Sequence, residues 1–170
     1  PKAPALPGNS EIKQTLDQLA RLAKQKDEKG VKRTLDMEFE AMQAVQSLLQ
    51  RTTMSQTESN ALEQIYFYLG CAYQMLGQFQ REQAHLDYAV DFFEKQLEIA
   101  GKNSGKSVAA YGNLGNTAIL QGDYFKAIEL LEKCQRVYSF GDDIQLKFGT
   151  FGSLSLLYRI TGQPTKAQKF

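Results

Sequence analysis

The chain has 170 residues, which is enough for one domain with a hydrophobic core. Its 20 basic and 19 acidic residues leave a formal charge of +1, so no overall electrostatic field favours nucleic acid or a membrane surface. A hydrophobic content of 42% with 23% charged residues is typical of a globular protein and excludes a disordered chain, and the apolar runs are too short for a membrane span.

The first 50 residues predict a leader and two helices. Three of the four prolines fall within residues 1–8, which we expect to be flexible. A first helix is expected to be capped by Asn9 or Ser10, and its apolar stripe consists of Ile12, Leu16, Leu19 and Ala23. After a turn at 27–30, a second helix is expected to face inward with Leu35, Phe39, Met42, Val45 and Leu49. Residues 9–50 are therefore either a degenerate repeat or an N-terminal cap.

A second pair of helices is predicted at residues 58–100. Ser55-x-x-Glu58 is the pattern of a capping box at a helix start. The helix that it opens is expected to run to Leu76 and to end at Gly77. Its partner, from about residue 79 to residue 100, carries apolar side chains at helical spacing: Leu86, Ala89, Val90, Phe93 and Leu97.

The clearest helical hairpin is predicted at residues 106–139. One face of its first helix is apolar, with Tyr111, Leu114 and Ala118. Gly115 lies between them and leaves room for a neighbouring helix to come close. Gly122 is expected to end this helix with a positive φ, and Asp123 to cap the next one. The second helix then returns to the first with Ala127, Leu131 and Cys134.

The pattern of this hairpin recurs on both sides. It appears 45 residues earlier, from Tyr66 to Gly77, and 40 residues later, from Phe151 to Gly162. Residues 143–170 therefore predict a truncated repeat, opened by a turn at 140–143, whose second helix begins at Pro164. Three aligned copies favour stacked helical hairpins over an irregular helical bundle. Aromatic residues of the pattern are expected in the core: Tyr66, Tyr73, Phe79, Tyr111, Tyr124, Phe151 and Tyr158.

Residues 60–170 resemble the tetratricopeptide repeat (TPR), with a period longer than the usual ~34 residues. Within that family they resemble the long-period repeats of the Pins/LGN polarity adaptors and of rapsyn-like proteins. The resemblance is carried by Asn113-Leu-Gly-Asn116, by Gly122-Asp-Tyr-x-x-Ala-Ile and by the connector at 99–106. It implies an all-α right-handed superhelix, an α-solenoid, that binds extended peptides in its concave groove. Asn116 stands at the groove-facing asparagine position of that group, and the matching positions hold Cys71 and Leu156.

The candidate partner-binding residues are those at first-helix positions that face the concave side in this fold. They are Phe67, Tyr68, Gln74, Asn113, Asn116, Leu120, Leu156 and Arg159. For the apolar members, packing against an adjacent repeat is an equal alternative. The polar members suit a peptide amide and an acidic side chain.

No pattern in the chain predicts catalysis, a metal site or a cofactor. Residues 101–107 resemble a phosphate-binding loop, but three residues separate the glycines instead of four, and a helix precedes them where a strand is required. His85 is the only histidine and has no orienting or ligating side chain at a suitable spacing. Cys71 and Cys134 are expected on different faces and unpaired, which favours an intracellular, cytoplasmic protein.

The sequence therefore predicts a non-catalytic scaffold or adaptor that holds a peptide or a helix of another protein in the TPR groove. The alternative is a structural subunit that self-associates through the open ends of its helical array, driven by an exposed apolar end at Phe170. We expect a protein partner and neither nucleic acid nor a membrane span.

Overall fold

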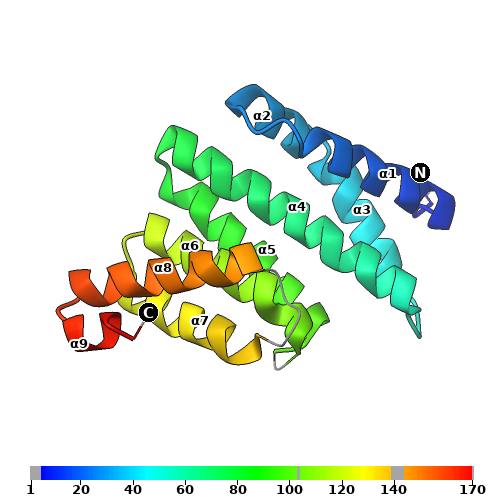
Figure 1. Ribbon diagram of the computed structural model, residues 1–170. Helices are drawn as coiled ribbons and strands as arrows, with labels where there is room; N and C mark the ends of the chain where they lie inside the picture. The colour runs from blue at the N-terminus through cyan, green and yellow to red at the C-terminus, as the bar shows by residue number, and fades with distance from the viewer. Residues whose placement is uncertain (1–4, 103, 139–143, 170) are drawn as a thin grey trace. The chain divides into compact units, whose positions relative to one another are not determined.

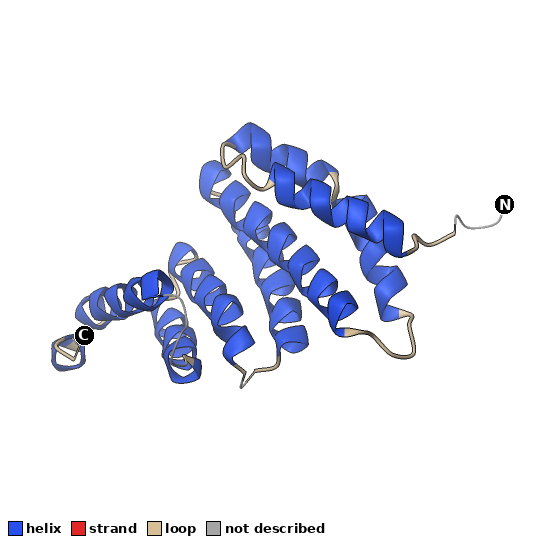
Figure 2. Cartoon of the chain, turned by 45° about the vertical axis from the view of Figure 1, so that its right-hand side comes forward, coloured by secondary structure: helices blue, strands red, loops and turns tan. Residues whose placement is uncertain are grey.

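The computed structural model describes residues 5–102, 104–138 and 144–169, and Figure 2 shows helices and loops without a β-strand in this described part. The chain divides into two compact units, residues 1–99 and residues 100–170. Each unit is built from antiparallel helices joined by short turns (Figure 1). The all-α fold class is confirmed. The expected turn at 140–143, the apolar end at Phe170 and half of the expected leader lie outside the described residues.

The first unit begins with helix α1 (Asn9–Leu22). Gly8 takes the N-cap position without a side-chain bond, so the predicted cap by Asn9 or Ser10 is wrong. The residues just before α1 are held on the unit, because the Ser47 hydroxyl donates to the Pro7 carbonyl at 2.7 Å. The apolar stripe of α1 faces the core of the unit. Ile12 is 4% exposed and Leu19 is 0% exposed.

The second expected helix is divided into α2 (Glu28–Asp36) and α3 (Glu38–Leu49). The break lies at Met37, whose φ of −89° and ψ of 0° leave the helical region. The predicted inward stripe is therefore wrong in part, since Phe39 is 73% and Leu49 55% exposed. The buried side chains of α3 are Ala41, Ala44, Val45 and Leu48. These four residues form a second apolar stripe on α3, and this stripe faces the core in place of the predicted one.

Helix α4 (Gln56–Gln80) packs against α1, α2 and α3, and α1 runs alongside it (Figure 1). The predicted cap at its start is confirmed, because Ser55 Oγ accepts a hydrogen bond from the Glu58 amide at 3.2 Å. Its predicted end at Gly77 is wrong: the helix continues to Gln80 and is followed by the C-cap residue Arg81, which has a φ of 53°. That extra turn carries Phe79, which is 48% exposed and not in the core as expected.

Helix α5 (Gln83–Ala100) returns along α4 and completes the core of the first unit. Glycines of α4 let the two helices approach closely. A Cβ atom at Gly70 would lie 2.6 Å from Phe93 Cε1, and one at Gly77 would lie 2.8 Å from Leu86 Cδ2. Phe93 is fully buried, as predicted. Gly77 therefore acts through close packing rather than as a helix end.

The second unit contains a 3-10 turn η1 (Gly105–Ser107) and the antiparallel helices α6 (Val108–Leu120) and α7 (Tyr124–Val137). The predictions for this hairpin are largely confirmed. Gly122 has a φ of 78°, and Asp123 Oδ1 accepts a hydrogen bond from the Lys126 amide at 3.1 Å. The three predicted contacts of α7 are buried: Ala127, Leu131 and Cys134. Tyr124 is 38% exposed, so its predicted core position is wrong.

Helix α8 (Ile144–Ile160) packs on α7, and the short α9 (Pro164–Ala167) packs back on α8. Gly162 ends α8 with a φ of 76°, and Pro164 opens α9, as predicted. One small residue in each first helix meets the second helix of its own pair. Gly70 meets Phe93, Gly115 meets Leu131, and the Ser155 hydroxyl donates to the Ala167 carbonyl at 3.4 Å. The repeated sequence pattern thus corresponds to a repeated contact.

Candidate protein-binding site

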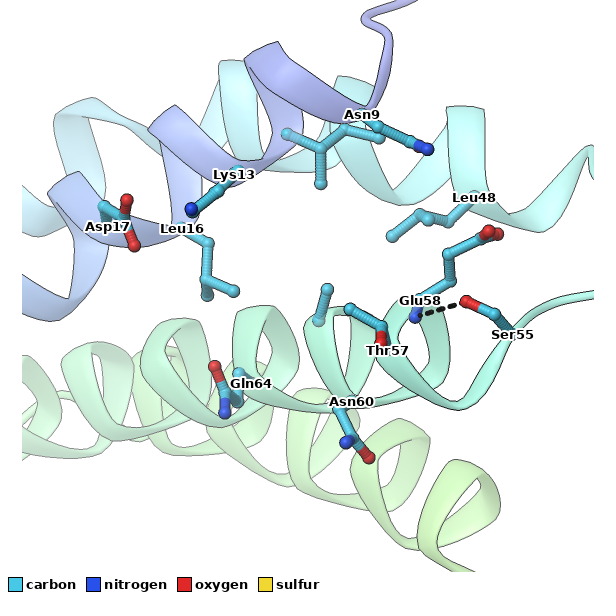
Figure 3. Close-up of a pocket in the computed structure, with 12 residues that line it drawn as sticks. Asn9, Lys13, Leu16, Asp17, Leu48, Ser55, Thr57, Glu58, Asn60 and Gln64 are labelled. Carbon is cyan, nitrogen blue, oxygen red and sulfur yellow. Dashed lines mark hydrogen bonds between the residues drawn. The ribbon is translucent and has the colours of Figure 1, made fainter.

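Two clefts lie along the seam between α1 and α4 in the first unit. The first, which we call the N-terminal cleft, has a volume of about 510 Å³ and is shown in Figure 3. Its floor is apolar, with Leu16 of α1 and Leu48 of α3 pointing into it. Its polar lining includes the opposite charges Lys13, Asp17 and Glu58. No predicted partner-binding residue lines this cleft.

The second, which we call the basic cleft, has a volume of about 470 Å³ and lies at the other end of α1. Its lining comes from the last turn of α1 and the following residues, from α2 and from one face of α4: Ala20, Ala23, Lys24, Gln25, Lys26, Thr34, Phe67, Tyr68, Cys71, Ala72, Gln74 and Met75. The predicted residues Phe67, Tyr68 and Gln74 therefore share one cleft. The rings of Phe67 and Tyr68 lie with centroids 5.4 Å apart.

Cys71 lies in the wall of the basic cleft, at the position that matches Asn116 in the repeat pattern. Burial raises the pKa of its thiol to about 12, and the Lys26 ammonium acts in the opposite direction. The thiol therefore stays protonated at neutral pH and is a poor nucleophile. Cys71 and Cys134 are both free cysteines in the structure.

In the second unit, Leu156 and Arg159 of α8 line a surface hollow of about 670 Å³ together with Phe148, Gly152 and Lys169. Leu156 is 58% exposed and Phe148 70% exposed. We call this the α8 hollow. It combines exposed apolar area with two cationic side chains, so two of the predicted residues again lie at a concave surface.

The remaining predicted residues Asn113, Asn116 and Leu120 lie on α6 at three- and four-residue spacing, which places them on one side of that helix. Asn113 is half-buried, and its carbonyl accepts a hydrogen bond from Thr117 Oγ1 at 2.8 Å. Asn116 is exposed and Leu120 is 39% exposed. None of the three lines one of the clefts described above.

Sequence reasoning missed Lys24 and Lys26, which line the basic cleft. Both follow the end of α1, where the sequence predicts only that a turn is near. Basic residues are common in exposed turns, so no sequence signal distinguishes them from solvated surface residues. The N-terminal cleft was missed for a similar reason, since Lys13 and Asp17 resemble an ordinary exposed helix face.

Residues 108–139, which span α6 and α7, match the family model of the tetratricopeptide repeat. A tetratricopeptide repeat is found here. TPRs generally mediate protein–protein interactions and are generally non-catalytic. No curated protein sequence and no solved structure matches the chain.

The described part of the chain contains neither a candidate metal site nor a candidate membrane span. No group of three or more His, Cys, Asp or Glu side chains within residues 5–102, 104–138 and 144–169 could hold a metal ion. None of the described helices combines the length and the apolar character needed to cross a membrane.

Proposed function

We propose that the chain is a non-catalytic scaffold that binds a segment of a partner protein through the exposed faces of its TPR first helices. The observation that carries this proposal is the basic cleft, where Phe67, Tyr68 and Gln74 line one concave surface. The repeat pattern of the sequence independently predicts the same three residues for the concave side. The TPR at residues 108–139 supports a protein partner rather than a small molecule.

The composition of the basic cleft suits a peptide. Phe67, Tyr68 and Met75 supply apolar and aromatic area on which a partner side chain can be buried. Gln74 carries both amide donors and a carbonyl acceptor, which can pair with a peptide backbone. In the second unit, Asn116 and Arg159 are exposed polar groups beside apolar ones, and we propose them as additional contacts.

The narrower resemblance to Pins/LGN and rapsyn-like adaptors, the superhelical arrangement of the repeats and a cytoplasmic location belong to the same proposal. They rest on the residues quoted in the sequence analysis. An interaction module needs no catalytic group, and the Cys71 thiol of the basic cleft stays protonated at neutral pH because burial raises its pKa.

Selection of a phage-displayed library of random 12-residue peptides on the full chain tests the proposal. Enriched peptides are then synthesised, and their affinities are measured by fluorescence polarisation. We expect Phe67→Ala and Gln74→Ala each to weaken binding about tenfold or more, while the thermal midpoint moves by no more than about 2–4 °C. Tyr88→Ala, at a 53% exposed position outside the clefts, is the control. Unchanged affinity in both cleft variants would refute the proposal.

Self-association is a second candidate, favoured by one observation in the second unit. Four apolar side chains of α8 are more than half exposed: Ile144, Phe148, Leu156 and Ile160. Exposed apolar side chains on one helix can bind a second copy of the chain. Sedimentation velocity from about 5 to 200 μM separates the candidates. A sedimentation coefficient that rises with concentration supports self-association, and a constant monomer value contradicts it.

A further inference from the structure

The charges around the basic cleft are unbalanced. Lys24 and Lys26 are exposed and line it, and no acidic side chain is among its described lining residues. Neither ammonium forms an ion pair with a described residue. At the other end of the same seam, the N-terminal cleft places Asp17 and Glu58 with Lys13. The positive charge is therefore specific to one end of the seam.

Acidic residues close in the sequence are already engaged elsewhere. Asp27 Oδ1 accepts a hydrogen bond from the Gly30 amide at 2.9 Å and thereby caps α2. Glu28 lies 3.3 Å from Lys32 Nζ and accepts a hydrogen bond from Gln80 at 3.3 Å. The fold thus leaves the two lysines after α1 without a carboxylate from their own turn.

The interior of the cleft is apolar and open. Small side chains at the end of α1, Ala20 and Ala23, line it together with the larger Phe67 and Met75 of α4. The resulting volume of about 470 Å³ is in the range of ligand pockets, which start at about 300 Å³. A large apolar side chain of a partner can enter it. The Lys26 ammonium acts to lower the pKa of the Cys71 thiol, so the positive charge of Lys26 reaches the wall of the cleft.

We propose that the basic cleft receives a peptide segment in which a large apolar side chain is flanked by carboxylates. The apolar side chain packs between α1 and α4, and the carboxylates pair with Lys24 and Lys26 at the rim. This inference rests on the proposed function, and it adds the chemistry of the partner. A neutral or basic segment of the same shape would lack the charge interaction and would bind more weakly.

Cys71 gives a direct test, because its sulfur is in the cleft wall. Three peptides, Ac-Cys-Gly-Phe-Glu-Glu-NH₂ and its Gln-Gln and Lys-Lys counterparts, are supplied as mixed disulfides with β-mercaptoethanol. Exchange with the Cys71 thiol forms the peptide–protein disulfide and releases β-mercaptoethanol. The captured fraction at equilibrium is read by intact mass on the full chain, and Cys71→Ser identifies the adduct site. Cys134 is 0% exposed and is not expected to react.

At low salt, we expect the captured fraction of the acidic peptide to be about five times that of the basic peptide. This ratio is what two exposed ion pairs would contribute. Raising the salt to about 1 M should reduce the preference. Lys24→Gln combined with Lys26→Gln should bring the preference within about twofold. Lys29→Gln combined with Lys102→Gln removes the same charge at exposed positions outside the cleft and should leave the preference intact.

The outcomes separate the two proposals. Capture of all three peptides to the same extent, but above that of Ac-Cys-NH₂, would overturn the charge inference and leave the proposed binding role standing. Capture of all three peptides no better than that of Ac-Cys-NH₂ would show that this cleft does not receive a peptide segment, and both proposals for it would fail.

Discussion

Replacing Gly115 by alanine tests whether the repeated glycine of the pattern acts through helix–helix contact. A Cβ atom at this position would lie 2.6 Å from Leu131 Cδ2 and 2.7 Å from Leu131 Cγ. Carbon atoms in ordinary contact are about 3.5–4.0 Å apart. Either α6 and α7 must separate by about 1 Å, or Leu131 must leave its rotamer. Leu131 is 1% exposed and surrounded by buried side chains, so it has little room to move.

The expected magnitude is the balance of two effects. Overpacking a core by one carbon atom costs about 1–3 kcal/mol, whereas alanine is favoured over glycine in a helix by about 1 kcal/mol. We therefore expect Gly115→Ala to lower the free energy of unfolding by about 1 kcal/mol. Gly149→Ala in α8 is the matched control, because no heavy atom lies within 4 Å of its Cβ position. It should raise the same quantity by about 0.5–1 kcal/mol.

Both variants lie in the second unit, so they report on the same structure. Urea unfolding of the full chain, followed by circular dichroism at 222 nm, gives the free energies and tests whether the slope m is unchanged. The two variants should differ by about 1–3 kcal/mol. If Gly115→Ala proves as stable as Gly149→Ala, the close approach of α6 and α7 at this position is wrong, and the glycine has no packing role.

Three further predictions concern binding, pH and the hairpin turn. Asn116→Ala and Arg159→Ala should weaken binding of library-selected peptides while leaving the thermal midpoint nearly unchanged, and equal loss of binding and stability would identify packing residues instead. Burial and the hydrogen bond that Tyr158 donates to Glu132 raise the tyrosine pKa to about 12, above about 10 in the unfolded chain. The stability that Tyr158 contributes is therefore complete below pH 10 and is lost between pH 10 and 12, and urea unfolding of Tyr158→Phe should show a smaller loss over this interval. Gly122→Ala forces a side chain into a φ of 78° and should lower the free energy of unfolding by about 1 kcal/mol, whereas an unchanged urea midpoint would show that this turn relaxes.

Local chemistry made much of the fold predictable. The cap by Ser55, the positive φ of Gly122 and the cap by Asp123 depend on residues within three or four positions of each other, and all three are confirmed. The close approach at Gly115 was predictable because a glycine inside an apolar helix face has few other uses.

Longer-range packing explains the predictions that failed. Gly77 has the same sequence setting as Gly122, but its Cβ position is filled by Leu86 of α5, and the helix passes through it. Phe39 and Leu49 match an apolar spacing, yet α3 buries a different stripe that includes Ala44 and Leu48. Hydrophobic periodicity identifies a possible face, and the neighbouring helix decides which face is used.

The candidate site was predictable to a similar degree. Phe67 and Gln74 are seven residues apart in one helix and share one side of it, so their position in one cleft followed from helix geometry, and the adjacent Tyr68 lines the same cleft. Lys24 and Lys26 reach the same cleft from a turn more than 40 positions earlier in the chain. Whether these lysines line the cleft depends on how the end of α1 packs against α4. The spacing of residues within either helix does not specify that packing.

The extra turn of α4 beyond Gly77 has a consequence for how such repeats can vary in length. Because each residue turns a helix by about 100°, four added residues rotate whatever follows by only about 40°, whereas two would rotate it by about 200°. A hairpin lengthened by one whole turn therefore keeps its apolar side toward its neighbour. Gly77 and the C-cap residue Arg81 are four residues apart, and Gly70 and Gly77 both still meet α5 in the lengthened helix.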